Sequence, residues 1–123
     1  MSGELWVVAG LLFDRAGRVL IAQRPPGKVL AGRWEFPGGK LAADEAPYAA
    51  LVRELREELD LEIGGAERLC CYAAVYPGRT IWLDVWTVTA WSGEPRGVDG
   101  QAFEWVAPAE LPRHDILEAD API

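Results

Sequence analysis

The sequence predicts an α+β sandwich, because segments with strand character lie before and after one strongly helical segment in a chain of 123 residues. The strand segments are apolar or aromatic runs bounded by Gly and Pro. The helical segment within residues 39–61 carries apolar residues on one arc and acids on another. Half of the residues are apolar, so we expect a single domain over residues 1–123 with one core.

The first strands are expected near the N-terminus. Residues 5–13 form an apolar run that predicts a buried strand, residues 14–17 predict a turn, and residues 19–23 predict the hairpin partner of that strand. Residues 25–27, Pro-Pro-Gly, end the pair. Residues 34–40, with the sequence WEFPGGK, predict a short extended segment whose glycines let the backbone approach a ligand closely.

The remaining strands follow the helix. Residues 68–76 and 80–91 predict a second pair of strands, joined by a Pro-Gly-Arg turn. In residues 81–86 both alternating sets contain large apolar side chains, which predicts a sheet covered on both faces. Residues 103–106 predict a short strand, and residues 108–111 predict a single helical turn.

Three acids of the helical segment share one arc. Each helical residue turns by about 100°, so Glu57 and Glu58 lie roughly 60° and 40° on either side of Glu54. Like charges at these spacings destabilise a helix by about 0.2–0.5 kcal/mol per pair. A divalent cation such as Mg²⁺, which prefers oxygen ligands, would offset this repulsion. The alternative is a solvated acidic face balanced by Arg53 and Arg56.

The segment that contains these acids resembles the signature of the Nudix hydrolases. The positions that match it in register are Gly39, Glu45, Arg53, Glu54, Leu55, Glu57, Glu58 and Leu61. Asp60 departs from the pattern, since the family has a second glycine there. That glycine ends the helix in a left-handed conformation, which Asp can adopt at a cost of up to about 1–2 kcal/mol. The resemblance implies the Nudix fold, an αβα sandwich with a mixed central β-sheet.

The resemblance also implies a magnesium site, with Mn²⁺ as an alternative ion. Its ligands would be Glu54, Glu57 and Glu58, together with the carbonyl of Gly38. Hydrolysis of a pyrophosphate bond needs a cation on the phosphate oxygens and a carboxylate that takes the proton of the attacking water. Glu54 is expected to act as both ligand and base. Asp99 stands where the MutT-type branch has a metal-binding Glu, and is either a further ligand or an ordinary turn residue.

Two more residues of the signature are expected to support catalysis. The resemblance implies that Arg53 orients Glu57 through a bidentate bond. It also implies that Glu45 lies behind the ligands and helps to hold them in place. The alternative for Glu45 is a residue at the start of the helix whose charge complements the helix dipole.

The likeness to the MutT-type branch extends along nearly the whole chain. It includes the segments WEFPGGK, GRTIWLDVW and WSGEP and the closing EADAPI. Carried over by position, it implies that Arg24 and Lys40 face the phosphates of a substrate and that Arg79 lies near the base and sugar. Phe36 and Tyr76 are candidates to flank the base.

We therefore expect a Mg²⁺-dependent nucleoside triphosphate pyrophosphohydrolase. It would convert 8-oxo-dGTP to the monophosphate and pyrophosphate, sanitising the nucleotide pool and so contributing to DNA repair. Asp120 stands where the MutT type has an Asn that reads oxidised guanine. An ionised Asp only accepts hydrogen bonds, which suits the amine of cytosine, whereas a protonated Asp imitates Asn and an Asp can also cap a helix. A pyrophosphatase for CTP or oxidised pyrimidine triphosphates and a non-catalytic nucleotide-sensing module stay open as alternatives.

Composition limits the partners. The net charge of −7 and the pI of about 4.7 argue against binding of DNA or RNA as a polymer, but allow a small nucleoside triphosphate. The apolar run of residues 5–13 is shorter than the ~20 residues that span a bilayer, so we expect no membrane association and a cytoplasmic location. Cys70 and Cys71 are adjacent in a predicted strand, point to opposite faces and are expected to be reduced. We further expect a monomer or weak homodimer, and a C-terminal helix that is short or missing at Ile123.

Overall fold

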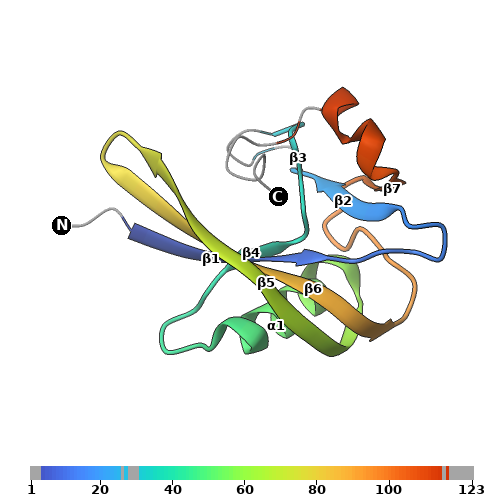
Figure 1. Cartoon of the computed structure of the whole chain (residues 1–123), viewed down its shortest axis with the longest axis horizontal. Coiled ribbons are helices and arrows are strands. Elements are labelled where there is room, and N and C mark those ends of the chain that lie inside the picture. The colour runs from blue at the N-terminus through green and yellow to red at the C-terminus, as the bar shows by residue number, and fades with distance from the viewer. Residues whose placement is uncertain (1–3, 26, 28–30, 115, 117–123) are drawn as a thin grey trace.

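The computed structural model describes residues 4–25, 27, 31–114 and 116. In these residues a helix, a larger β-sheet and a smaller β-sheet lie in successive layers (Figure 1). Helix α1 (Pro47–Leu59) packs on one side of the larger sheet, and the smaller sheet lies on the other side with the 3-10 helix η1 (Pro108–Arg113). No helix among the described residues is long and apolar enough to cross a membrane.

The larger sheet is mixed. Its strands, in the spatial order β4-β1-β6-β5, are β4 (Gly38–Lys40), β1 (Glu4–Leu11), β6 (Arg79–Ser92) and β5 (Glu62–Tyr76). Strand β1 runs parallel to β6 and antiparallel to β4, and β5 runs antiparallel to β6. The α+β class and the mixed sheet are therefore confirmed.

The smaller sheet corrects one predicted pairing. It contains β3 (Trp34–Glu35), β2 (Val19–Gln23) and β7 (Phe103–Val106) in the order β3-β2-β7. Residues 19–23 were expected to form a hairpin with residues 5–13, but between these segments only a single bridge from Phe13 to Val19 and a hydrogen bond from Leu20 N–H to the Leu12 carbonyl are formed. The prediction was wrong because β4 and β6 occupy both edges of β1.

The second predicted pair of strands is correct, but its first strand is longer than expected. Strand β5 begins at Glu62, six residues before the predicted start at Arg68. The sequence hides this extension because Gly64 and Gly65 are typical of loops. Shifts of register in the pairing with β6, between Ile63 and Gly65 and again between Gly65 and Ala66, accommodate these glycines.

Two hydrophobic clusters lie on opposite faces of the larger sheet. The first joins Val8 of β1 to the buried side of α1, which includes Leu51 and Leu55. The second joins Ala9 of β1 to β2 and to Phe36. Successive side chains of a strand point to opposite faces, so Val8 and Ala9 each anchor one cluster. This packing fixes α1 and the segment around Phe36 relative to the same strand.

Helix α1 ends at Leu59, immediately before the Asp60 that stands in the place of the glycine of the signature. Its N-terminal cap is Ala46 and Pro47 is its first residue, a position where a proline costs no hydrogen bond. Asp60 follows the helix in the left-handed conformation, with φ 59° and ψ 38°. The N–H of Asp60 donates to the carbonyl of Arg56, and the N–H of Leu61 donates to the carbonyl of Leu55. The first of these bonds is the one that defines the αL motif, so Asp60 takes the place of the helix-ending glycine.

Candidate active site

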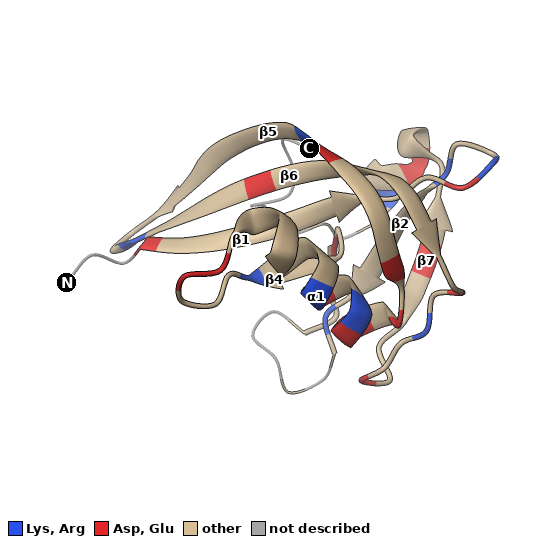
Figure 2. Cartoon of the chain, turned by 90° about the horizontal axis from the view of Figure 1, so that it is seen from below, with Lys and Arg blue, Asp and Glu red and all other residues tan. Residues whose placement is uncertain are grey.

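A cleft of about 1160 Å³ gathers most of the residues that the sequence singled out. It is lined by the end of β2, the β3–β4 segment, one side of α1 and the turn between β5 and β6, and acidic and basic positions lie side by side on and before α1 (Figure 2). The predicted site residues that line it are Arg24, Phe36, Gly38, Lys40, Glu54, Glu57, Glu58, Tyr76, Arg79 and Asp99. Asp120 and the end of the chain, where a short or missing helix was expected, lie outside the described residues.

The two glycines of WEFPGGK bring the backbone close to the helix acids. A Cβ atom at Gly38 would overlap the carbonyl of Val8 in β1. A Cβ atom at Gly39 would overlap the carboxylate of Glu54. Gly38 therefore requires glycine, since a side chain there would push β4 away from β1, whereas a side chain at Gly39 would displace the carboxylate of Glu54.

Arg53 is the centre of an ion-pair network on one side of the cleft. Its Nε and Nη2 donate to the two carboxylate oxygens of Glu45 at 2.8 and 2.9 Å. Its Nη1 donates to Glu57 at 2.9 Å, and Nη2 also donates to the carbonyl of Lys40 at 3.0 Å. The bidentate partner is thus Glu45 and not Glu57 as expected, because Glu45 in the loop before α1 lies at the Nε–Nη2 edge of the guanidinium.

The same network explains the ionisation of Glu45. The hydrogen bonds from Arg53, aided by the N–H of Ala42, lower the pKa of Glu45 to about 2. Glu45 precedes the helix cap and accepts bonds that tie the loop to α1, so it is both a residue at the start of the helix and the partner of Arg53.

Glu58 and Glu54 are the acids that lie deepest along the helix face. Burial raises the pKa of Glu58 to about 8, and the charges of Glu35, Glu54 and Asp99 add to this effect, against a hydrogen bond from the Gly38 N–H. Burial also raises the pKa of Glu54, with Arg53 opposing the shift. Without a cation in the cleft, Glu58 therefore keeps its proton at neutral pH.

Glu35 is a site residue that sequence reasoning missed. It lies in β3 and lines the cleft, and among the neighbouring charges its charge has the largest effect on the pKa of Glu58. Nη1 of Arg24 lies 3.2 Å from its carboxylate. The available signal was its place in WEFPGGK, immediately before Phe36 and the two glycines. The bond to Arg24 places that predicted phosphate-binding residue beside an acid.

The acids line the same cleft, but their carboxylates do not surround a common position where an ion could bind. Among the described residues, no three His, Cys, Asp or Glu side chains are arranged so that they could hold a metal ion as they stand. Glu57 is held in part by its 2.9 Å bond to Arg53. Glu54 lies 3.4 Å from the same guanidinium. Arg53 therefore competes with any cation for two of the three helix carboxylates.

The candidates for base and phosphate contacts differ in how much surface they offer. Phe36 lines the cleft but is buried in the second core cluster, so its ring offers little free surface for stacking. Tyr76 and Arg79 lie at the turn between β5 and β6. Lys40 ends β4 on the exposed side of the same cleft. The basic residues thus lie around the acids without neutralising Glu58.

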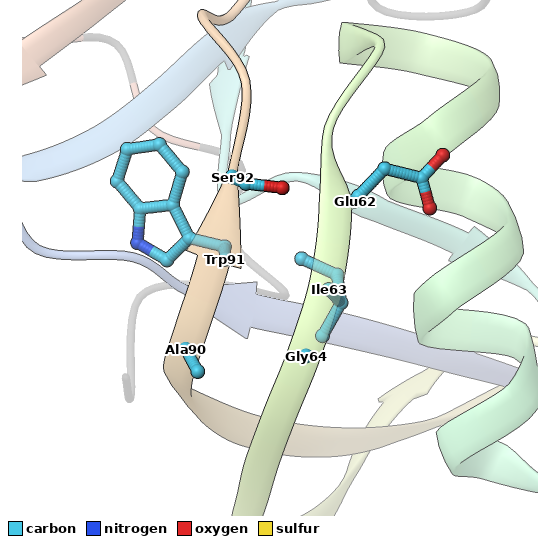
Figure 3. Close-up of a pocket in the computed structure, with 6 residues that line it drawn as sticks. All are labelled: Glu62, Ile63, Gly64, Ala90, Trp91 and Ser92. Atoms are coloured by element: carbon cyan, nitrogen blue, oxygen red, sulfur yellow. The ribbon is translucent and has the colours of Figure 1, made fainter.

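A second hollow, of about 280 Å³, lies between the ends of β5 and β6 (Figure 3). It is lined by Glu62, Ile63, Gly64, Ala90, Trp91 and Ser92. Glu62, its single titratable residue, points toward α1 and receives bonds of 3.0 and 2.8 Å from Arg56. The side chains that line this hollow therefore include no candidate catalytic group.

Comparison with known proteins agrees with this geometry. The NUDIX domain model matches residues 4–123. The CTP pyrophosphohydrolase of Escherichia coli (strain K12) is 39% identical over 116 residues, covering 94% of this chain and 86% of that protein. The 8-oxo-dGTP diphosphatase of Proteus vulgaris is 42% identical over 91 residues, covering 74% of this chain and 81% of that protein.

Solved structures give the same answer for the fold. The solution structure of the E. coli ORF135 protein superposes with a TM-score of 0.85 at 38% identity, covering 98% of this chain and 86% of that one. The α+β Nudix fold is thus confirmed by sequence and by structure, as is the expectation of a Nudix hydrolase. The chain belongs to the NUDIX domain family.

Proposed function

We propose that this chain is a Mg²⁺-dependent nucleoside triphosphate pyrophosphohydrolase of the MutT type. The observation that carries the proposal is the meeting of Glu35, Glu54, Glu58 and Asp99 at one cleft, where their charges act on one another. A cleft of about 1160 Å³ has room for a nucleoside triphosphate. Perturbed carboxylates in such a cleft are typical of a catalytic site, and excess negative charge favours a divalent cation.

The family typically depends on a divalent metal. The described acids do not surround one point as they stand, but Glu54, Glu57 and Glu58 line one cleft and supply the oxygen ligands that such an ion prefers. Glu58 holds a proton that a cation would replace, which is the behaviour of a ligand site with too little positive charge. The ligands would be Glu54, Glu57 and Glu58 with the Gly38 carbonyl, and Asp99 would join them from its loop. When bound, Mg²⁺ or Mn²⁺ polarises the phosphate oxygens and makes a bound water more acidic.

The residues of the chain supply the remaining chemistry. The Glu54 carboxylate takes the proton of the water that attacks phosphorus, the bond from phosphorus to the bridging oxygen breaks, and pyrophosphate leaves with the electron pair. Its raised pKa brings Glu54 closer to the operating pH of a general base. Arg53 fixes the orientation of Glu57, and is itself fixed by Glu45. Lys40 contacts the phosphates.

Selection of the base falls to other residues that line the cleft. These are Tyr76 and Arg79 at the turn between β5 and β6, and the buried Phe36. In the proposal the preferred substrate is 8-oxo-dGTP, which places the enzyme in the sanitation of the nucleotide pool and in DNA repair. The similarity to a CTP pyrophosphohydrolase favours CTP or an oxidised pyrimidine triphosphate as the second candidate. Asp120 is the residue on which this choice is expected to depend.

A substrate panel tests the proposal. Pyrophosphate release is measured from 8-oxo-dGTP, dGTP, CTP, dCTP and an oxidised pyrimidine triphosphate, with Mg²⁺, with Mn²⁺ and with chelator. We expect release that requires metal and is fastest with 8-oxo-dGTP. Faster release from CTP would instead support the second candidate. Binding of nucleotides without release from any of them would overturn the proposal and favour a sensing module.

The variant Asp120→Asn tests whether Asp120 recognises the base. If ionised Asp120 accepts a hydrogen bond from the base, the amide should shift kcat/KM toward 8-oxo-dGTP relative to CTP by roughly 10- to 150-fold. If Asp120 is protonated, the wild-type preference for 8-oxo-dGTP should fall with rising pH and that of the variant should not. No change in either property would assign selection to Arg79 and Tyr76.

A further inference from the structure

The loop that carries Asp99 is attached to the C-terminal end of α1. The last carbonyls of a helix have no partner within the helix. Here the N–H of Arg96 donates to the carbonyl of Leu59 at 2.9 Å, and the N–H of Val98 donates to the carbonyl of Glu58 at 3.1 Å. The loop thus provides hydrogen-bond donors for the last carbonyls of α1, the helix that bears the acids of the cleft.

One side chain completes this attachment. Nε2 of Gln101 donates to the carbonyl of Glu58 at 3.1 Å, and Oε1 of Gln101 accepts the N–H of Asp99 at 2.9 Å. Both ends of the amide are therefore used, one on each of two acidic residues. Gly97 makes the arrangement compact, since a Cβ atom there would overlap the carbonyl of Gln101, and the Gly100 N–H closes the turn on Gly97 at 2.9 Å.

We propose that Gln101 is a positioning residue that sets where the Asp99 carboxylate lies relative to Glu54 and Glu58. Asp99 is exposed at the tip of a turn, so without the amide its own N–H loses the acceptor and the tip is held only through the neighbouring bonds of Val98 and Gly100. Gln101 is uncharged and cannot itself replace a carboxylate. Its effect must therefore pass through the position of Asp99. This inference rests on the proposed function, because it is metal binding that the position serves.

The test compares Gln101→Met with a matched control. Met has nearly the same length and shape but cannot donate to Glu58 or accept from Asp99. The control is Gln23→Met, because Gln23 also lines the cleft and its Nε2 donates to the carbonyl of Gly32, not to the Asp99 loop. Its backbone bond to the carbonyl of Ala102 is kept in the variant. Amide hydrogen exchange is measured in the metal-free proteins, and Mn²⁺ binding is measured by titration. Both measurements are repeated in an Asp99→Asn background.

Exchange of the Asp99 amide should become about 10-fold faster in Gln101→Met, because its hydrogen-bond acceptor is lost. Exchange of the Asp60 amide, which is bonded within the helix end, should not change. Mn²⁺ affinity should fall by about 10-fold, in the range typical when a residue that supports a metal ligand is removed. Gln23→Met should change neither, and in the Asp99→Asn background Gln101→Met should have no further effect on Mn²⁺ affinity.

Unchanged exchange at Asp99, or an unchanged Mn²⁺ affinity, would overturn the inference. An equal loss of affinity in the Asp99→Asn background would also overturn it, since Gln101 would then act through another residue. Failure of the proposed function is separate, because it shows as absence of pyrophosphate release in the wild type. The exchange measurement on the metal-free protein decides the hydrogen-bond tie in either case.

Discussion

Two acids that are largely removed from water are treated in opposite ways by this fold. Asp84, in the middle of β6, is 2% exposed and accepts two hydrogen bonds of 2.8 Å from Arg68. The guanidinium of Arg68 also lies over the ring of Trp86, 5.0 Å from its centre. Glu58 has no ion pair within the described residues, and the charges that raise its pKa are those of the acids Glu35, Glu54 and Asp99.

The difference separates a structural acid from a functional one. A buried carboxylate with a dedicated guanidinium is neutralised on folding and needs no ligand. A carboxylate whose neighbours are also acids raises the free energy of the metal-free fold, and persists where a ligand will supply the missing positive charge. The absence of a positive partner for Glu58 among the described residues is therefore a stronger indication of the active site than the number of acids.

The largest effect is expected for Glu58→Gln. The amide keeps the shape of the side chain but removes a negative charge from the cleft, so kcat/KM should fall by at least about 10²-fold, or roughly 2.7 kcal/mol. The metal-free protein should melt at about the same temperature near pH 7, where Glu58 is already neutral, and at a higher temperature above pH 8, where an ionised Glu58 would repel Glu54. Steady-state kinetics and a melting curve measure the two. Activity near that of the wild type would place Glu58 with Asp84 as a structural acid.

Arg68→Met is the opposite experiment. It leaves Asp84 buried without its partner, which should reduce the free energy of unfolding by about 2–3 kcal/mol, below the full cost for a buried pair because Arg68 is half-exposed. Hydrolysis per folded molecule should not change, since neither residue lines the cleft. Denaturant unfolding is compared with the double variant Arg68→Met with Asp84→Asn, which should recover part of the loss. A loss of activity in folded Arg68→Met would contradict the assignment of Arg68 and Asp84 to a purely structural role.

The contrast between these acids could be predicted from the sequence only in part. The spacing of Glu54, Glu57 and Glu58 predicts their shared face, because helical periodicity is local. The left-handed conformation of Asp60, which the glycine of the signature left open for an Asp, is observed. Glu35 was missed because its charge reaches Glu58 across the cleft, through packing of β3 and β4 that no spacing encodes.

The sequence also did not predict which of several possible partners a residue or strand pairs with in the folded protein. Arg53 lies one helical turn from Glu57, which suggests that pair, yet Glu45 takes the bidentate place because the loop before α1 folds back onto it. Likewise, adjacency along the chain suggested a hairpin for β1 and β2, but β6 pairs along β1 instead. Cys70 and Cys71 are free and exposed, in line with the expected reduced thiols.

A smaller effect is expected when pH is changed in the metal-free protein. The pKa of Glu58 is raised in the folded state, so between about pH 5 and 8 the folded state binds a proton that the unfolded chain has lost. The stability that this proton gives is complete below the unfolded pKa and is lost as pH rises through about 8. We expect a loss of about 1–2 kcal/mol across this range, allowing for water in the cleft. Urea unfolding at several pH values measures it.

Two controls sharpen this measurement. Glu58→Gln should remove most of the pH slope, because no proton is bound at that position in either state. Millimolar Mg²⁺ should also flatten it and raise stability at pH 8, because the cation replaces the proton. A slope that is the same with Glu58→Gln would assign it to other groups.

The smallest effect concerns Asp60, an acid whose place is set by its backbone and not by charge compensation. It is exposed and holds the left-handed conformation that ends α1, where its negative charge also opposes the helix dipole. Asp60→Gly should stabilise the fold by up to about 1 kcal/mol, and Asp60→Asn by a few tenths, since Asn removes the charge but keeps the side chain. Urea unfolding of both variants separates the two contributions. Equal stability of Asp60→Gly and Asp60→Asn would mean that charge alone matters, and that the substitution of Asp for glycine costs the helix end nothing in backbone strain.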